Sequence, residues 1–382
     1  MLALTVARFS MAAGVPSITE LWASNGLSRG DFYLLEILFA LSLLVLEVLT
    51  GRLADRFGIV HTLRLGFLAI LLGTIGYVFA GSFRDFLIAE VFLALGLALT
   101  SGTDEACMYQ SSKAINEADS HQSWWLANTC VGFVSMALLS IAGGFLAVQG
   151  SAAPFEFAAI LVLLGLLLSL GLVEPPKDRT IVATERTQLL RAISAVLVDC
   201  PSVRWMCFAP ALLITLNQTF LWIYPEMLKG CGLSMDESGW AFALFNVVAG
   251  LSALHAWRSK RARASETAVL FFLGIALACS IFGLLTFEGR LLWLFIVPQQ
   301  VVRSIAGPLF SQRINDGIPD DVRATALSIR NAVRVAIYVS VMIPWWLWID
   351  ALGLRGMFLV NLSILVLGLT VLWKTSPERQ SA

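Results

Sequence analysis

The feature that most constrains this chain is a series of long apolar runs that fills most of its 382 residues. Each run is close to the ~20 residues that an α-helix needs to cross the ~30 Å hydrocarbon layer of a bilayer. Hydrophobic residues make up 58% of the chain and charged residues 14%, against roughly 45–50% and 25% in soluble domains. Because so few charges cannot cover a water-facing surface of this size, we expect an all-α membrane protein surrounded by lipid.

The apolar runs predict twelve transmembrane helices in two sets of six. A polar segment near the middle of the chain separates the sets. In the first half, the expected spans include 2–22, a second span ending near 51, 63–83 and 86–106, and a polar loop at 110–123 follows the fourth span. In the second half, the expected spans are 205–227, 237–257, 267–287, 291–311, 323–348 and 355–373. We therefore expect an N-terminal six-helix bundle at 1–173, a cytoplasmic linker at 174–204 and a C-terminal six-helix bundle at 205–382.

Short echoes in the loops support a repeat of the first half in the second. Gly-Leu-Ser occurs at 26–28 before the second span and at 232–234 before the eighth. Ile-Asn followed by an acidic residue occurs at 115–117 after the fourth span and at 314–316 after the tenth. Parallel repeats of this kind place a substrate site near the bilayer midplane between the two halves.

The basic residues predict which way the chain crosses the membrane. Seventeen of them lie in loops on the side of the linker or in the C-terminal tail, whereas the opposite loops hold five: Arg29, Arg84, Lys229, Arg290 and Arg355. Lys and Arg concentrate on the cytoplasmic side of membrane proteins. We therefore predict a multi-pass protein of the cytoplasmic (inner) membrane with both termini in the cytoplasm.

A charged turn runs from Gly51 to Gly58, between the second and third spans. Its two glycines allow a tight turn and the close approach of a neighbouring helix. Asp55 and Arg56 place charges at the entrance of any cavity that the helices enclose. This position predicts a short loop at the membrane surface.

Together with Glu47 just before it, this turn resembles the loop between the second and third helices of bacterial members of the major facilitator superfamily. The family pattern is Gly-x-x-x-Asp-Arg-x-Gly-x-basic-basic, and this chain departs from it with Val60 and His61 at the basic positions. The resemblance implies two pseudo-symmetric six-helix bundles that transport a small solute by alternating access. It implies a transporter and not an enzyme.

The resemblance also implies a gate. In the family, the aspartate of this motif sits against the start of helix eleven when the cytoplasmic side is shut. That role falls to Asp55, and the N–H groups at a helix N-terminus do attract an anion. Arg323, at the start of the predicted eleventh helix, adds a positive charge. We therefore expect a cytoplasmic latch between the two halves.

Four arginines lie inside predicted spans, where an unpaired charge costs ~2.5–3.5 kcal/mol. They are Arg8, Arg303, Arg330 and Arg334. Because Arg330 and Arg334 are four residues apart, they share one helix face, which should look at protein or water. The available acidic partners are Glu47, Asp104 and Glu105. Buried ion pairs that simply tie helices together are the alternative to a gating role.

The family's fold places helices one, four, seven and ten around the substrate cavity. The candidate substrate-binding residues, which include one from helix eleven, are Arg8, Asn217, Gln218, Trp222, Gln299, Gln300, Arg303 and Arg334. Amides, an aromatic ring and positive charge suit an organic anion or amphipathic metabolite with a carboxylate or phosphate. Hydrogen bonds between helices would explain the amides equally well. An efflux carrier for neutral or cationic compounds and a non-transporting receptor stay open as alternatives.

Glu36 and Glu90, in the outer halves of the second and fourth spans, are candidates to carry a coupling proton, with packing or a surface position as the alternative. The fourth span lacks the family's arginine-glycine pattern, and Gly143-Gly144 lacks a preceding Gly-Pro pair, so drug–proton antiport is not favoured. The cysteines and histidines show no metal spacing. We expect no metal, no cofactor and no nucleic-acid partner, and a monomer.

Overall fold

The computed structural model describes residues 6, 9–50, 53–114, 121–174, 201–258, 265–306 and 323–376, and in this part of the chain the regular elements are helices without strands. The chain divides into two compact units. The first combines Met1–Arg179 with Tyr224–Gly250, and the second combines Thr180–Ile223 with Leu251–Ala382. The predicted all-α class is confirmed, while a division of the chain at a linker over 174–204 stays a prediction.

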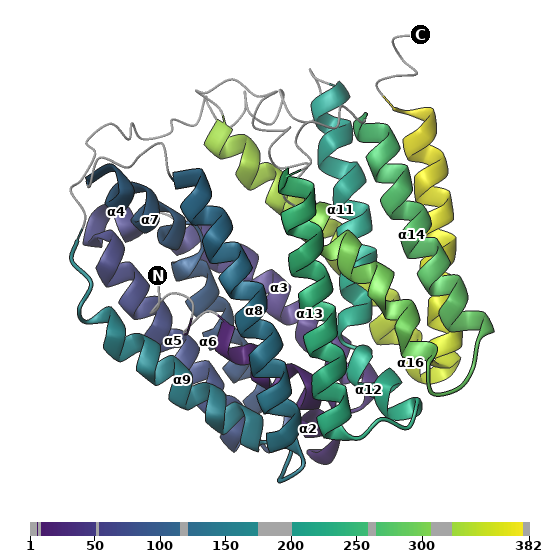
Figure 1. The fold of residues 1–382 in the computed structure, drawn as a ribbon, viewed down its shortest axis with the longest axis horizontal. Coiled ribbons are helices and arrows are strands. Elements are labelled where there is room, and N and C mark those ends of the chain that lie inside the picture. The colour runs from purple at the N-terminus through teal and green to yellow at the C-terminus, as the bar shows by residue number, and fades with distance from the viewer. Residues whose placement is uncertain are drawn as a thin grey trace. The chain divides into compact units, whose positions relative to one another are not determined.

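The first unit is built around the helix α5. Its elements are η1 (Ser10–Ala13), η2 (Val15–Ser17), α2 (Ile18–Ser24), α3 (Arg29–Thr50), α4 (Leu53–Phe57), α5 (Ile59–Phe79), α6 (Phe83–Thr100), α7 (Thr103–Ala114), α8 (His121–Ala147), α9 (Ala153–Ser169), α12 (Tyr224–Gly230) and α13 (Met235–Arg258) as far as Gly250. α5 packs against α6 and α9, and α3 packs against α6 (Figure 1). The α5–α6 contact is close because a Cβ added to Gly96 would lie 2.8 Å from the Gly66 carbonyl oxygen, and small residues allow such an approach in membranes.

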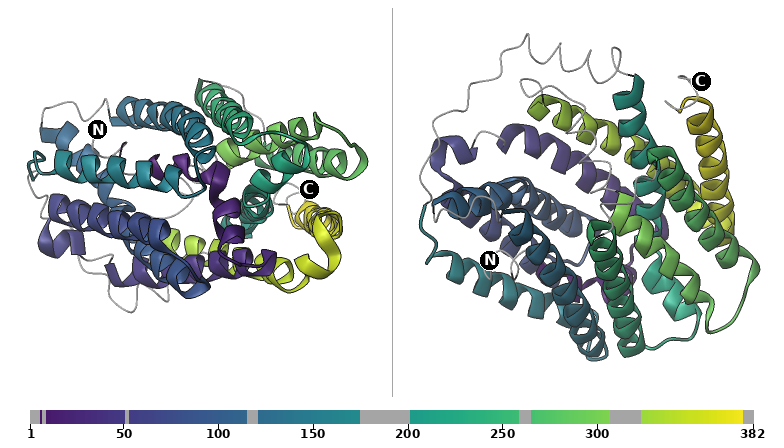
Figure 2. Two further views of the ribbon diagram at one scale, coloured as in Figure 1. Left: turned by 90° about the horizontal axis from the view of Figure 1, so that it is seen from below. Right: turned by 45° about the horizontal axis from the view of Figure 1, so that its top comes forward.

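The first span is interrupted, whereas the sequence predicted one helix over 2–22. In its described part, two short 3₁₀ helices, η1 and η2, precede α2, and Figure 2 shows these purple pieces in place of one straight rod. Pro16 lacks a backbone N–H, which weakens regular helix there. The Ser17 hydroxyl donates to the Gly14 and Ser151 carbonyl oxygens, both at 3.3 Å. Non-helical backbone at membrane depth is tolerated only where protein or a water-filled cavity surrounds it.

The predicted polar loop at 110–123 is wrong at both ends. α6 ends at Thr100, and after Gly102, whose φ is +73°, α7 continues through Ala114. α8 then begins at His121. The polarity of this segment indicates that it leaves the hydrocarbon, but it does not prevent helix formation, because α7 buries Thr103, Asp104 and Cys107 against its neighbours.

The second unit contains α11 (Pro201–Leu221), α14 (Glu266–Thr286), η5 (Leu292–Ile296), α16 (Arg323–Lys374) and the last turns of α13. α11 and α14 both pack against α16, and Figure 1 shows them beside its final, yellow turns. α16 is not one straight helix, because Gly353 has φ 63° and ψ −178°. This break separates the spans predicted at 323–348 and 355–373.

Length and composition support a membrane position. In the part of the chain that the structure describes, six helices are each long and apolar enough to span a bilayer. Others fall short for visible reasons: α9 has 17 residues, and α11 passes the test only together with α12. Large apolar side chains stay exposed on the helix surfaces, such as Val48 at 77% and Phe79 at 82%, as expected where lipid is the solvent.

Candidate functional site

The predicted gate falls mostly outside the described residues. Gly51 is not described, and the side chains of Asp55, Glu105 and Arg323 lie outside the described part as well. The latch between Asp55 and the start of helix eleven therefore stays a prediction. Of the remaining motif residues, Arg56 is exposed, and its guanidinium lies 5.5 Å from the centre of the Phe57 ring.

The last glycine of the motif has a clear structural role. Gly58 has φ +97°, a backbone conformation that residues with a side chain rarely adopt. The Glu174 carboxylate accepts hydrogen bonds from the backbone N–H groups of Ile59 at 2.6 Å and Val60 at 2.9 Å. A Cβ on Gly58 would lie 2.9 Å from Glu174 Oε1. Glycine is thus required both by its φ and by the carboxylate that caps α5.

Arg64 completes this contact from the opposite direction. Its guanidinium donates to the carbonyl oxygens of Ser169 at 3.2 Å, Leu170 at 3.1 Å and Leu172 at 3.2 Å, at the end of α9. An anion at a helix N-terminus and a cation at a helix C-terminus are both stabilising. The pair Glu174 and Arg64 thus docks α5 onto α9 in a chain that lacks the family's two basic residues. From the sequence, Glu174 was predicted only to be the first residue of the linker.

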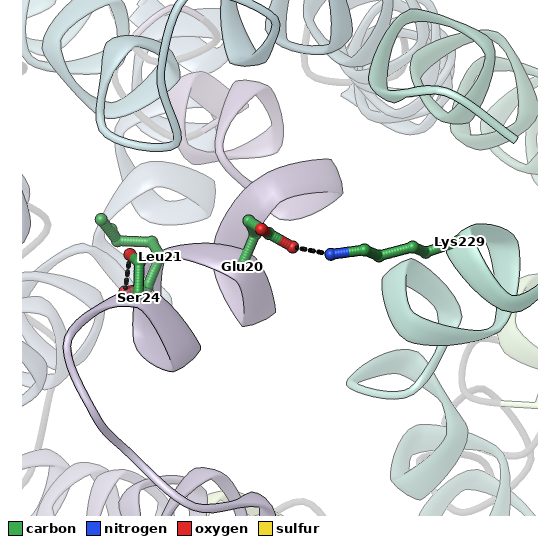
Figure 3. A network of polar contacts seen from close by, with 4 residues as sticks. All are labelled: Glu20, Leu21, Ser24 and Lys229. Atoms are coloured by element: carbon green, nitrogen blue, oxygen red, sulfur yellow. Dashed lines mark hydrogen bonds and ion pairs between the residues drawn. The ribbon is translucent and has the colours of Figure 1, made fainter.

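Two charge pairs join α2 and α3 to α12, all within the first unit. Lys229 Nζ lies 2.7 Å from Glu20 Oε2, and Figure 3 shows the two side chains pointing toward each other from α12 and α2. Arg29, at the start of α3, pairs with Glu226. From the sequence, Arg29 and Lys229 were used only to predict the orientation of the chain, and this role was not predicted. The signal available in the sequence was the rarity of basic residues on that predicted outer side.

Glu36 and Glu90 are both buried, with 3% and 4% of their surface exposed. This excludes the surface position that the sequence had left open. The Tyr77 hydroxyl donates a hydrogen bond to Glu90. Packing and proton binding remain as their possible roles.

The predicted amides differ in their surroundings. Gln299 and Gln300 are fully buried. Gln299 Nε2 donates to Ser280 Oγ at 2.8 Å, and the Ser280 hydroxyl donates to the Phe295 carbonyl oxygen. Gln299 thus links the segment after η5 to α14, which favours the interpretation of a bond between helices.

Asn217 is a stronger candidate for contact with a ligand. It is 4% exposed, and its Oδ1 has no hydrogen-bond partner among the described residues. A buried acceptor without a partner is costly, so such a group calls for a water or a ligand. Further along the same span, beside the half-buried Gln218, Trp222 Nε1 donates to the Tyr338 hydroxyl at 3.4 Å.

The intramembrane arginines of the second unit are half-buried. They are Arg303, Arg330 and Arg334. Arg334 donates from Nε and Nη2 to Asn331 Oδ1 at 3.2 and 3.0 Å, one turn earlier on α16. The other predicted members, the half-buried Glu47 and the buried Asp104, belong to the first unit. Arg8 lies outside the described residues.

Comparison with known proteins identifies the family. The sequence model of the Major Facilitator Superfamily matches residues 1–341. The probable vesicular acetylcholine transporter-B of Danio rerio is 25% identical over 231 residues, which is 59% of this chain and 45% of that protein. The match therefore spans less than half the length of this relative.

Solved structures with the same fold include three kinds of transporter. A D-xylose–proton symporter has a TM-score of 0.77 at 17% identity, covering 99% of this chain and 97% of its own. A mutant of the nucleoside transporter NupG has 0.79 at 11%, covering 98% of each chain. An auto-inhibited peptide transporter of the POT family has 0.71 at 13%, covering 100% and 96%. The protein is thus a multi-pass membrane protein with a transporter fold, and it belongs to the major facilitator superfamily.

Proposed function

We propose that this protein is a secondary active transporter that moves a small organic solute across the cytoplasmic membrane by alternating access. The observation that carries the proposal is a pair of interruptions at corresponding places in the two sequence repeats. The first span breaks between η1 and α2, and the seventh breaks at Trp222 and Ile223, between α11 and α12. Interrupted helices at matching positions are the best sequence-level pointer to a transporter's binding site.

The short helices beyond these breaks are suited to act as gates. α2 and α12 have seven residues each, so each can tilt about its own break without moving a whole span. The Glu20–Lys229 and Arg29–Glu226 pairs hold this predicted outer end closed. The predicted Asp55 latch would close the cytoplasmic end. Opening the outer side would then break the two charge pairs while the latch is formed, and opening the cytoplasmic side would break the latch while the charge pairs are formed.

A substrate with a carboxylate or phosphate is supported by Arg330 and Arg334. Both lie inside α16, four residues apart, and are half-buried. Two guanidinium groups on one helix face repel each other. An anionic solute bound beside both of them would reduce that repulsion. The amide oxygen of Asn217, which has no hydrogen-bond partner among the described residues, adds an acceptor for a hydroxyl or ammonium group on the same solute.

An organic cation is the second candidate substrate. It is favoured by the buried carboxyl groups of Glu36 and Glu90 in the first unit and by the similarity to a protein named as a vesicular acetylcholine transporter. Carboxylates attract cations in a low-dielectric interior much more strongly than in water. The two candidates predict opposite charge preferences.

A ligand screen followed by transport separates these candidates. Purified protein would be screened for thermal stabilisation by organic anions, organic cations and neutral sugars or nucleosides, and stabilising solutes would be tested for uptake into proteoliposomes. We expect anions to stabilise the protein, Arg334→Gln to abolish that effect, and the exposed-residue control Arg84→Gln to keep it. Stabilisation by cations or neutral solutes alone would overturn the anion proposal. A stabilising solute that never enters the vesicles would instead indicate a receptor.

A further inference from the structure

The first unit contains two buried acidic residues on neighbouring helices. Glu36 is on α3 and Glu90 is on α6, which packs against both α3 and α5. The partner that α5 offers to Glu90 is the Tyr77 hydroxyl, itself only 1% exposed. Burying a carboxylate is costly unless it is paired with a cation or becomes neutral. Tyr77 is a neutral partner, so this carboxyl group is placed where gaining a proton changes its environment strongly.

Aromatic rings pack around Tyr77, the hydroxyl partner of this pair. The Tyr77 ring stacks on Phe155, with ring centres 5.0 Å apart and planes at 15°. Its edge meets Phe86 at 5.4 Å, and Trp22 lies at 6.5 Å. Because these rings pack directly on Tyr77, a proton is the ligand that Glu90 can gain without repacking its neighbours. A tyrosine hydroxyl can donate to a carboxylate and accept from a carboxylic acid, so the pair persists in both protonation states.

The same cluster touches the short helix α2. Trp22 is fully buried on α2 and contacts Phe32 at 5.1 Å as well as Tyr77. Glu20, two residues earlier on α2, forms the charge pair with Lys229 (Figure 3). One side of α2 therefore packs on Tyr77, the hydrogen-bond partner of Glu90, and another side contacts α12.

A second connection runs along α3. Arg29, Tyr33 and Glu36 are spaced by four and three residues, so they lie on one helix face. Tyr33 is buried on this face, one turn from Arg29 and one turn from Glu36. The Glu20–Lys229 pair is thus connected to Glu90 through Trp22 on α2 and Tyr77, and Arg29 lies on the same face of α3 as Glu36.

We propose that Glu90 and Tyr77 form a proton-binding site, and that proton binding there keeps α2 packed and the two charge pairs to α12 formed. The proposal adds a coupling proton to the proposed transporter. In the loaded state the proton sits on a Glu90 carboxyl oxygen, and the Glu90 O–H donates to Tyr77. Release leaves a carboxylate that accepts from Tyr77, with the proton passing to water. An ionised Glu90 buried beside the neutral Tyr77 hydroxyl is unfavourable, so release of the proton favours movement of α2 away from Tyr77 and entry of water.

Few other titratable groups are placed to produce this response. On the helices packed around the Glu90 segment of α6, Tyr77 comes from α5, and Glu36 and Tyr33 come from α3. α7 continues the chain beyond the far end of α6. Glu20 and Glu226, in the charge pairs themselves, would respond with the opposite sign, because their protonation at acidic pH breaks the pairs. The direction of the pH effect therefore distinguishes Glu90 from the pairs.

Infrared spectroscopy tests the site directly. Purified protein in lipid nanodiscs would be titrated while the C=O stretch of protonated carboxyl groups is recorded. We expect a titrating band that disappears in Glu90→Gln and shifts in Tyr77→Phe, which keeps the ring packing. The control Glu156→Gln, at an exposed position on α9, should leave the band unchanged. A band that is identical in the wild type, Glu90→Gln and Tyr77→Phe would overturn the proposal.

Labelling of Cys231, the residue directly after α12, tests the link to the charge pairs. The five other cysteines would be replaced by serine, and labelling by a membrane-impermeant maleimide would be normalised at each pH to unfolded protein. We expect labelling to rise several-fold as the pH increases in the wild-type background, and to stay low at all pH values in Glu90→Gln. Labelling that rises toward acidic pH would overturn the proposed control of the pairs by Glu90.

These two tests do not depend on transport. If the infrared band titrates through Glu90 and labelling follows it, the proton site stands even if no solute enters proteoliposomes, and only the transporter proposal fails. If solute transport is found but Glu90→Gln changes neither the band nor the labelling, the transporter stands and the proton site fails.

Discussion

The buried polar side chains of the two units differ in chemical kind. In the first unit they include carboxyl groups, with Glu90 bonded to Tyr77. Among the described residues of the second unit they are amides, hydroxyls and an indole N–H: Asn361 Nδ2 donates to Thr219 Oγ1 at 2.8 Å, and Trp345 Nε1 donates to Asn361 Oδ1 at 3.0 Å. Amides keep the same hydrogen bonds at every physiological pH, whereas a carboxyl group changes charge. The second network is therefore suited to fixed structure and the first to switching.

The largest effect on stability is expected from removing one of the aromatic rings that pack on Tyr77 in the first unit. Phe155 is fully buried, and its ring stacks on Tyr77. Phe155→Ala leaves a cavity beside the Tyr77 ring and should cost about 3–5 kcal/mol of stability, measured by thermal or denaturant unfolding in one detergent. The control Phe79→Ala, at an exposed site, should change stability little. An equally small effect of Phe155→Ala would show that the rings around Tyr77 are loosely packed and accessible to water.

The next effect is expected at the centre of the second network. Asn361 bonds both α11 and the part of α16 before the Gly353 break. Asn361→Leu leaves the Trp345 N–H without its acceptor and should cost about 2–3 kcal/mol. The loss should be the same at pH 5.5 and pH 8, and the control Ser363→Ala, at an exposed position, should be nearly neutral. A loss that varies with pH would remove the distinction between the two networks.

A smaller effect is expected at Gln299. If its bond to Ser280 only links helices, Gln299→Leu should cost about 1 kcal/mol and leave the affinity for a stabilising solute unchanged. The double variant with Ser280→Ala should cost less than the sum of the single variants, because the two residues share one hydrogen bond. Lost solute affinity without lost stability would instead restore Gln299 to the substrate site.

The smallest effect is expected at an exposed carboxylate, Asp85. Hydrogen bonds from the Ser82 hydroxyl at 2.8 Å and the Gly81 N–H at 3.2 Å lower the pKa of Asp85. A group whose pKa is lower in the folded state stabilises the protein above its unfolded pKa and loses this effect as the pH falls through the folded pKa. Asp85→Asn should therefore lower the melting temperature slightly at pH 7 and leave it unchanged in strong acid. A difference that persists in strong acid would show that the charge of Asp85 is not its cause.

Much of the fold followed from the sequence, because lipid forces simple rules on a chain. A single segment can satisfy its own backbone groups in hydrocarbon only as a helix, so the long apolar runs predict helices. The interruption of the first span was not predicted from Gly14 and Pro16, because glycine and proline are common in membrane helices. They interrupt such a helix only when neighbouring groups satisfy the freed backbone hydrogen-bonding groups. Here Ser17 and the carbonyl oxygen of Ser151, which is distant in sequence, provide that compensation.

The candidate site was predicted less completely. Residue type suggested that Gln299 and Asn217 were equivalent, but one has a hydroxyl partner on α14 and the other has a buried oxygen without a described partner. The charge pairs to α12 and the Glu174 cap of α5 join residues more than a hundred positions apart. Spacing along a chain carries no information about such partners.

By itself, the sequence determined that this chain is a helical membrane protein of the major facilitator type, because hydropathy and one charged motif depend on residues that are close together in the chain. Only the tertiary structure decided which polar groups meet. It paired Glu90 with Tyr77, closed α2 onto α12 through Glu20 and Lys229, and gave Gly58 its carboxylate neighbour. Those contacts depend on how helices pack side by side, and packing is a property of the folded chain as a whole.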